Sequence, residues 1–166
     1  MSPLDLSRLS GPDAVAALRS YPRRYRGAIL PVNDPETEEL AYRMGPSGHT
    51  AVDLVTHATN TFVLLGQALS QILQGTDPVL HPGVTNGAER EWTAAPGLTA
   101  TDALDRFETE AGALADIVAG LHLPDSARTG RVAGGSEVTT MDIAKEAVQV
   151  GAADLDEIKA TLAAVG

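Results

Sequence analysis

The histidines are the first candidates for chemistry in this sequence, because imidazole binds metal ions and exchanges protons near neutral pH. The chain has four histidines and no cysteine, so thiolate metal sites, disulfides and cysteine nucleophiles are excluded. It lacks the Gly-x-Ser-x-Gly pattern that would anchor a hydrolase triad. The stretch Val132–Ser136 lacks the lysine and the spacing of a phosphate-binding loop. The histidines are therefore the first residues to consider for chemistry.

Three of the four histidines have positions that indicate structural or surface roles. His49 directly precedes a predicted helix, and His81 lies in a proline-rich loop. His122 closes another predicted helix, where a cation is favourable beside the helix dipole. His57 differs because it lies inside a predicted helix.

Four segments begin with the same helix-start signal, a Ser or Thr followed three residues later by Asp. The hydroxyl can accept a hydrogen bond from a free N–H of the first turn, and the Asp can reach back to the cap. Each signal precedes a run of apolar residues at helical spacing. The sequence therefore predicts four helices, over about residues 11–28, 50–74, 99–122 and 139–164.

The connections between these helices are long and rich in Pro and Gly, over residues 31–48, 75–98 and 123–138. This arrangement is typical of a four-helix bundle of mixed topology, so we expect an all-α fold and a single domain over residues 1–166. Pro22 should kink or divide the first helix. Strand-like alternation is limited to residues 27–32, and residues 131–137 would form a short hairpin or an irregular loop.

The distribution of charge sets one helix apart. The net charge is −10, which argues against nucleic-acid binding because phosphate contacts need a basic face. Between Arg43 and Asp77 the only charged residue is Asp53, so the helix over 50–74 should be buried on two sides. Its apolar stretch Phe62–Leu65 favours a homodimer through this helix. The alternative is that the loops 31–48 and 75–98 cover it.

Two stretches of the sequence resemble the DinB-like superfamily, which includes the N-terminal domain of mycothiol-dependent maleylpyruvate isomerase. The first stretch is Ser47–Asn60, and the second begins at Gly135 and continues into the last helix as far as Ile158. The resemblance implies a DinB-like four-helix bundle over nearly the full chain. It also implies a divalent metal, zinc or nickel, bound by one histidine of the second helix and two residues spaced four apart on the last.

Only part of that ligand set is present in this sequence. The ligand positions fall on His57, Val150 and Asp154, and an aliphatic valine cannot bind a metal. A third ligand could come from Glu146 or Asp53, although Glu146 also fits a solvated helix residue and Asp53 fits the cap of Thr50. Without metal, His57 would be a buried histidine hydrogen-bonded to Asp154 across the bundle, or a polar surface histidine.

Two functions follow from this partial site. The first is a non-catalytic or small-ligand-binding protein with a degenerate metal site and no cofactor, because Val150 makes the interior drier. The alternative, implied by the resemblance, is a divalent-metal-dependent enzyme such as a thiol-dependent transferase or isomerase acting on a small organic substrate. No apolar run is as long as a membrane helix, which needs about 18 residues. The N-terminus lacks the apolar segment of a signal peptide. We therefore expect a soluble, cytoplasmic protein, with Trp92 acting as a lid on the core.

Overall fold

Four long helices make up most of the computed structural model, which describes residues 4–166 apart from the side chains of Leu123 and Ser126. They are α1 (Gly11–Ile29), α3 (Ala51–Gln74), α4 (Ala100–Ala119) and α6 (Thr140–Val165). The shorter elements lie in the connections: helices α2 (Thr37–Leu40) and α5 (Leu123–Ser126), the 3₁₀ turns η1 (Pro82–Val84) and η2 (Gly87–Glu89), and strands β1 (Val79–Leu80), β2 (Thr129–Val132) and β3 (Glu137–Thr139). The four predicted helices are confirmed.

Each long helix begins at the predicted hydroxyl cap. Ser10, Thr50, Thr99 and Thr139 each accept a hydrogen bond from the backbone N–H three residues later. In α1, α3 and α6 the aspartate also accepts from the cap backbone, which completes a capping box. None of the helices in residues 4–166 combines the length and the apolar character that a bilayer crossing requires.

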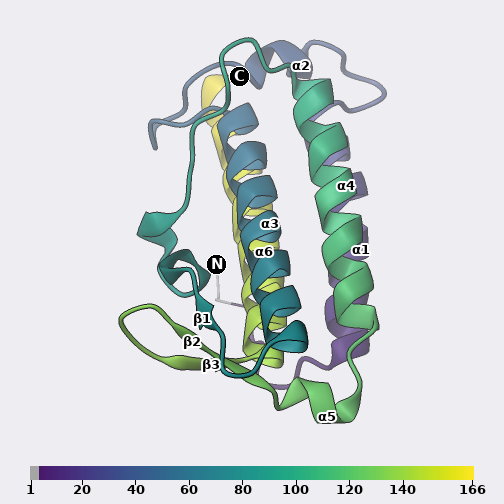
Figure 1. Ribbon diagram of the computed structural model, residues 1–166. Helices are drawn as coiled ribbons and strands as arrows, with labels where there is room; N and C mark the ends of the chain where they lie inside the picture. The colour runs from purple at the N-terminus through teal and green to yellow at the C-terminus, as the bar shows by residue number, and fades with distance from the viewer. Residues whose placement is uncertain (1–3) are drawn as a thin grey trace.

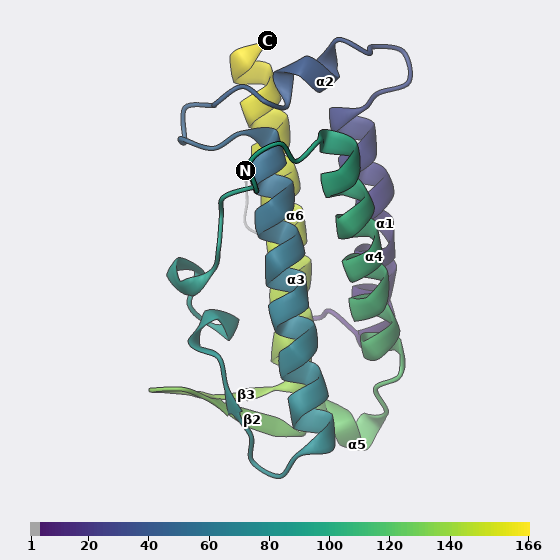
Figure 2. The same ribbon diagram turned by 45° about the horizontal axis from the view of Figure 1, so that its top comes forward.

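The bundle has a mixed topology, as expected. α1 and α6 run in one direction, and α3 and α4 run in the other (Figure 1). α1 packs against α4 and α6, and α3 packs against the same two helices, so α1 and α3 lie on a diagonal of the bundle. Because α3 and α4 run in parallel, the chain between them must return along the length of the bundle, and it passes beside α3 and α6 (Figures 1 and 2).

An aromatic cluster at the centre joins α1 to the other helices. The ring of Tyr25 stacks on Phe107 with centroids 4.2 Å apart. The hydroxyl of Tyr21 donates to the carbonyl of Val148 at 2.7 Å, and that of Tyr25 donates to the carbonyl of Gly151 at 2.6 Å. These contacts hold α1 against α6. α1 is not divided at Pro22, so a split helix there was a wrong expectation.

A small three-stranded sheet closes one end of the bundle (Figure 2). β1 pairs in parallel with β2, and β2 pairs antiparallel with β3. The hairpin expected as one of two alternatives at residues 131–137 is thus present. The strand-like residues 27–32 form no strand, because α1 continues to Ile29. The strands are two to four residues long, so the fold remains an all-α bundle.

Candidate functional site

His57 and Asp154 meet inside the bundle. His57 projects from α3 and Asp154 from α6, and these two helices pack against each other. Nδ1 of His57 lies 2.6 Å from Oδ2 of Asp154. The two residues are only 4% and 5% exposed. The expected hydrogen bond across the bundle is therefore confirmed, and the alternative of a surface histidine is wrong.

The burial of this pair and its internal hydrogen bond determine which of its atoms can bind another group. Burial raises the pKa of Asp154 above its ordinary value of 3.8, and the hydrogen bond and charge of His57 and the charge of Arg90 oppose this shift. In the tautomer that carries its proton on Nδ1, neutral His57 donates a hydrogen bond to Oδ2 of Asp154, and the lone pair of the ring lies on Nε2. Within the described part of the chain, Nε2 is buried and has no hydrogen-bond partner.

The surroundings of the pair do not supply a set of three metal ligands. Val150 lies one turn before Asp154 on α6 and is 7% exposed, so it presents methyl groups where the resemblance implies a ligand. No group of three His, Cys, Asp or Glu side chains that could hold a metal ion occurs in residues 4–166. Oδ2 of Asp154 is hydrogen-bonded to Nδ1 of His57. Nε2 of His57 is a buried nitrogen without a hydrogen-bond partner among the described residues, and three protein ligands are usual for a catalytic zinc.

The two other proposed ligands have different partners. Oε1 of Glu146 lies 3.0 Å from Nη2 of Arg90, and Arg90 also donates to the carbonyls of Gly83 and Val84. Glu146 thus binds a loop, while 37% of its side chain stays exposed, so it is a partly solvated helix residue as expected. Asp53 accepts from the backbone N–H of Thr50, as expected for a cap.

Asp53 also places Trp92 over His57. Its second carboxylate oxygen, Oδ1, accepts from the backbone N–H of Ala94 at 3.0 Å. The indole of Trp92 stacks on His57 with ring centroids 3.6 Å apart and on His49 with centroids 4.6 Å apart. Trp92 is half-buried against the core, so the expected lid is present. The sequence pattern did not reveal that His49 belongs to this stack, because nothing local to His49 indicates a ring about forty residues later.

The remaining histidines have structural or peripheral positions. Nδ1 of His81 accepts from the backbone N–H of Gly83 at 2.9 Å and so caps the start of η1. His122 does not close the third long helix, which was the expectation, because α4 ends at Ala119; it is instead the exposed N-cap residue of α5. Neither contributes to the His57–Asp154 pair, as expected.

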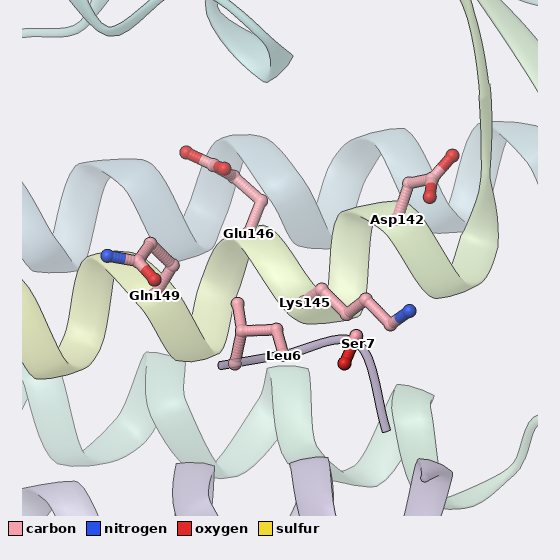
Figure 3. A pocket seen from close by; sticks show the side chains of 6 residues that line it. All are labelled: Leu6, Ser7, Asp142, Lys145, Glu146 and Gln149. Carbon is pink, nitrogen blue, oxygen red and sulfur yellow. The ribbon is translucent and has the colours of Figure 1, made fainter. Parts of the chain in front are cut away.

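Two surface hollows lie away from the His57–Asp154 pair. One, of about 330 Å³, is lined by Leu6, Ser7, Asp142, Lys145, Glu146 and Gln149. Figure 3 shows the segment of Leu6 and Ser7 along one side of α6, with Asp142 and Glu146 projecting from the other. The second, of about 520 Å³, lies between α3 and α4. Neither is lined by His57 or Asp154.

Comparison with known proteins gives the fold of this chain. No family model matches the sequence, and no curated protein is significantly similar to it. Among solved structures, the chain is similar to YfiT from Bacillus subtilis, described as a probable metal-dependent hydrolase with an unusual four-helix bundle topology. The TM-score is 0.71 at 14% sequence identity, over 97% of this chain and 90% of YfiT. The chain therefore has the four-helix-bundle fold of YfiT, and the expected four-helix bundle is confirmed.

Proposed function

We propose that this protein is a non-catalytic member of the DinB-like bundles, in which a hydrogen-bonded histidine–aspartate pair has replaced the metal centre. It acts through binding rather than through metal chemistry. The observation that carries the proposal is the 2.6 Å contact between Nδ1 of His57 and Oδ2 of Asp154, one turn beyond Val150.

The chemistry of the donors supports this function. A catalytic metal needs several ligands that point at one ion and a position left open for substrate. Here Asp154 is engaged by His57, and Val150 contributes only hydrocarbon. The Trp92 ring covers one face of the imidazole. The same residues that would ligate a metal instead join two helices.

A second candidate function is a divalent-metal-dependent enzyme, and one atom favours it. Nε2 of His57 is buried with no hydrogen-bond partner among residues 4–166. Its ring is held through Nδ1 by a carboxylate, as in many histidines that ligate a metal. YfiT, which shares the fold, is described as a probable metal-dependent hydrolase. This candidate needs further ligands that the described residues do not bring together.

Metal analysis separates the two functions. The protein would be purified without a metal-affinity tag, incubated with zinc or nickel, dialysed, and analysed for bound metal. The His57→Ala variant removes the pair, and His122→Ala is the matched control because His122 is exposed at the start of α5. We expect no stoichiometric metal in any of the three proteins. Stoichiometric metal in the wild type and in His122→Ala, lost in His57→Ala, would overturn the proposal in favour of the enzyme.

A further inference from the structure

The chain between η1 and α4 buries little of its own surface. None of the residues from Thr85 to Thr99 is buried, whereas Val84 before them and Ala100 after them are. This part of the chain runs alongside α3 and α6, outside the four-helix core (Figures 1 and 2). Segments with few buried contacts open at a lower free energy than the unfolding of the whole protein. Residues 85–98 thus form a strap on the surface of the bundle.

Two hydrogen bonds join the strap to the long helices. Oδ1 of Asp53 on α3 accepts from the backbone N–H of Ala94 at 3.0 Å. Nη2 of Arg90 donates to Oε1 of Glu146 on α6 at 3.0 Å. In the described structure, the other backbone N–H groups that the strap satisfies bond within the connection itself. The closed position of the strap therefore depends on these two contacts and on its half-buried apolar side chains.

Arg90 makes the closed position sensitive to a single side chain. Its side chain is only 5% exposed although it carries a charge. It donates to the carbonyls of Gly83 and Val84 as well as to Glu146. A buried guanidinium is costly without its carboxylate partner, and in an open strap water would hydrate it. Loss of the contact between Arg90 and Glu146 therefore favours the open strap.

The strap covers the imidazole of His57. The indole of Trp92 lies on this ring with centroids 3.6 Å apart and planes inclined by 17°. His57 is 4% exposed, and its Nε2 has no hydrogen-bond partner among residues 4–166. Asp53 lies one turn before His57 on α3, so the contact with Ala94 and the covered ring share one face of this helix. Displacement of the strap would remove the indole from the imidazole without separating α3 from α6.

We propose that the strap is a movable cover, whose local opening exposes the imidazole of His57 to solvent while the four long helices stay folded. It thereby regulates access to the histidine–aspartate pair, and in this respect it rests on the proposed function. Gly87 and Gly97 lie near its two ends. Gly97 has a φ of +79°, a conformation that glycine adopts without strain. The backbone can therefore change direction at the ends of the strap.

Chemical modification of the histidines measures the opening. Diethyl pyrocarbonate acylates the nitrogen lone pair of an accessible neutral imidazole, and mass spectrometry of the digested protein gives the rate at each histidine. The exposed His122 is the internal reference. In the wild type at neutral pH, His57 should react slowly, at a rate that changes little at low urea concentrations, because local opening exposes little surface. The rate should rise steeply only where the whole bundle unfolds.

Two arginine variants locate the opening in the strap. Arg90→Gln removes the ion pair with Glu146, and without urea it should accelerate the modification of His57 at least about tenfold. This faster rate should keep its weak dependence on urea. Arg26→Gln is the matched control, because it removes an arginine–carboxylate pair between α1 and α4 and touches no contact of the strap. Its His57 should react at the rate of the wild type.

Two results would overturn the proposal. One is a His57 rate in the wild type that rises from the lowest urea concentrations with the full slope of global unfolding. The other is an equal rate in Arg90→Gln and Arg26→Gln. The measurement uses no metal, so a strap that stays closed would leave the proposed function standing. Stoichiometric metal bound through His57 would instead overturn that function and leave the rates of the metal-free protein as they are.

Discussion

Oδ2 of Asp154 lies 2.6 Å from Nδ1 of His57, and this contact joins α6 to α3 in the interior of the bundle. Both side chains are almost completely buried, so each depends on the other for its hydrogen bond. The pair has a structural consequence that does not depend on any ligand: removing one partner leaves the other polar group buried without compensation.

The first prediction concerns the coupling within this pair. Asp154→Ala and His57→Ala should each lower the free energy of unfolding by about 3 kcal/mol, because each leaves a buried polar partner unsatisfied. Replacing both residues with leucine should cost much less than the sum of the two single changes. Urea unfolding of the three variants measures the coupling. Additive losses would show that the two side chains do not act as a pair.

The second prediction concerns pH. Burial raises the pKa of Asp154 above 3.8 in the folded protein, so folding favours its protonated form. Its contribution to stability is fully present below the unfolded pKa of about 3.9 and is lost as pH rises through the higher folded value. Asp154→Asn cannot titrate. The unfolding free energy of the wild type should therefore fall relative to that of this variant as pH rises from about 4.

Urea unfolding of both proteins at a series of pH values gives the difference between their unfolding free energies. Acidic groups that both proteins share contribute equally to the two values and cancel in the difference. A difference that stays constant with pH would contradict the raised pKa of Asp154, and so would one that moves in favour of the wild type.

The third prediction concerns the contact between α1 and α6. A Cβ at Gly151 would overlap the ring of Tyr21, which donates to the nearby carbonyl of Val148. Gly151→Ala should therefore destabilise the protein by about 1–3 kcal/mol. Gly112 lies inside α4 with open space around an added Cβ, and Gly112→Ala should instead stabilise the helix by about 0.5–1 kcal/mol. Thermal unfolding distinguishes the two, and equal effects would contradict the close packing at Gly151.

The fourth prediction concerns the segment that carries Trp92. Asp53 caps α3 and also accepts from the N–H of Ala94, whereas Asp13 caps α1 and has no contact with this segment. Asp53→Ala and Asp13→Ala should each cost about 0.5 kcal/mol from the helix terminus. Only Asp53→Ala should make the single tryptophan more accessible to acrylamide quenching. Equal quenching in both variants would show that Asp53 does not hold the segment in place.

The main helices could be predicted from the sequence because their signals are local. The hydroxyl–aspartate caps at Ser10, Thr50, Thr99 and Thr139 each involve residues three apart. Helical periodicity also placed Asp154 on the inner face of the last helix, opposite His57. These features need only the spacing of neighbouring residues and the geometry of a helix.

The features that the sequence did not reveal are long-range. β1 pairs Val79 with Arg131, and each strand is too short to show an alternating pattern. The Trp92 stack depends on the hydrogen bond between Asp53 and Ala94, about forty residues apart. The partner of Glu146 is Arg90 in a distant loop. Such pairings depend on how the loops return along the bundle, which residue spacing does not determine.

The fifth prediction concerns Val150, the aliphatic residue at a position where the resemblance implies a ligand. Positions 150 and 154 lie on the same face of α6 because they are four residues apart. Val150→His would add an imidazole one turn before Asp154. This variant should bind zinc more tightly than the wild type, and calorimetric titration of the untagged proteins measures the difference. Equal affinity would show that Val150 does not limit metal binding.

The most direct test of the central claim is the ¹⁵N spectrum of the His57 imidazole in the wild-type protein, recorded before and after one equivalent of zinc is added. The account predicts that Nδ1 keeps its proton and its hydrogen bond to Asp154, and that the Nε2 signal does not move. A shift of Nε2 to the position of a metal-bound nitrogen, absent from the His122 signals, would contradict the replacement of the metal centre by this pair.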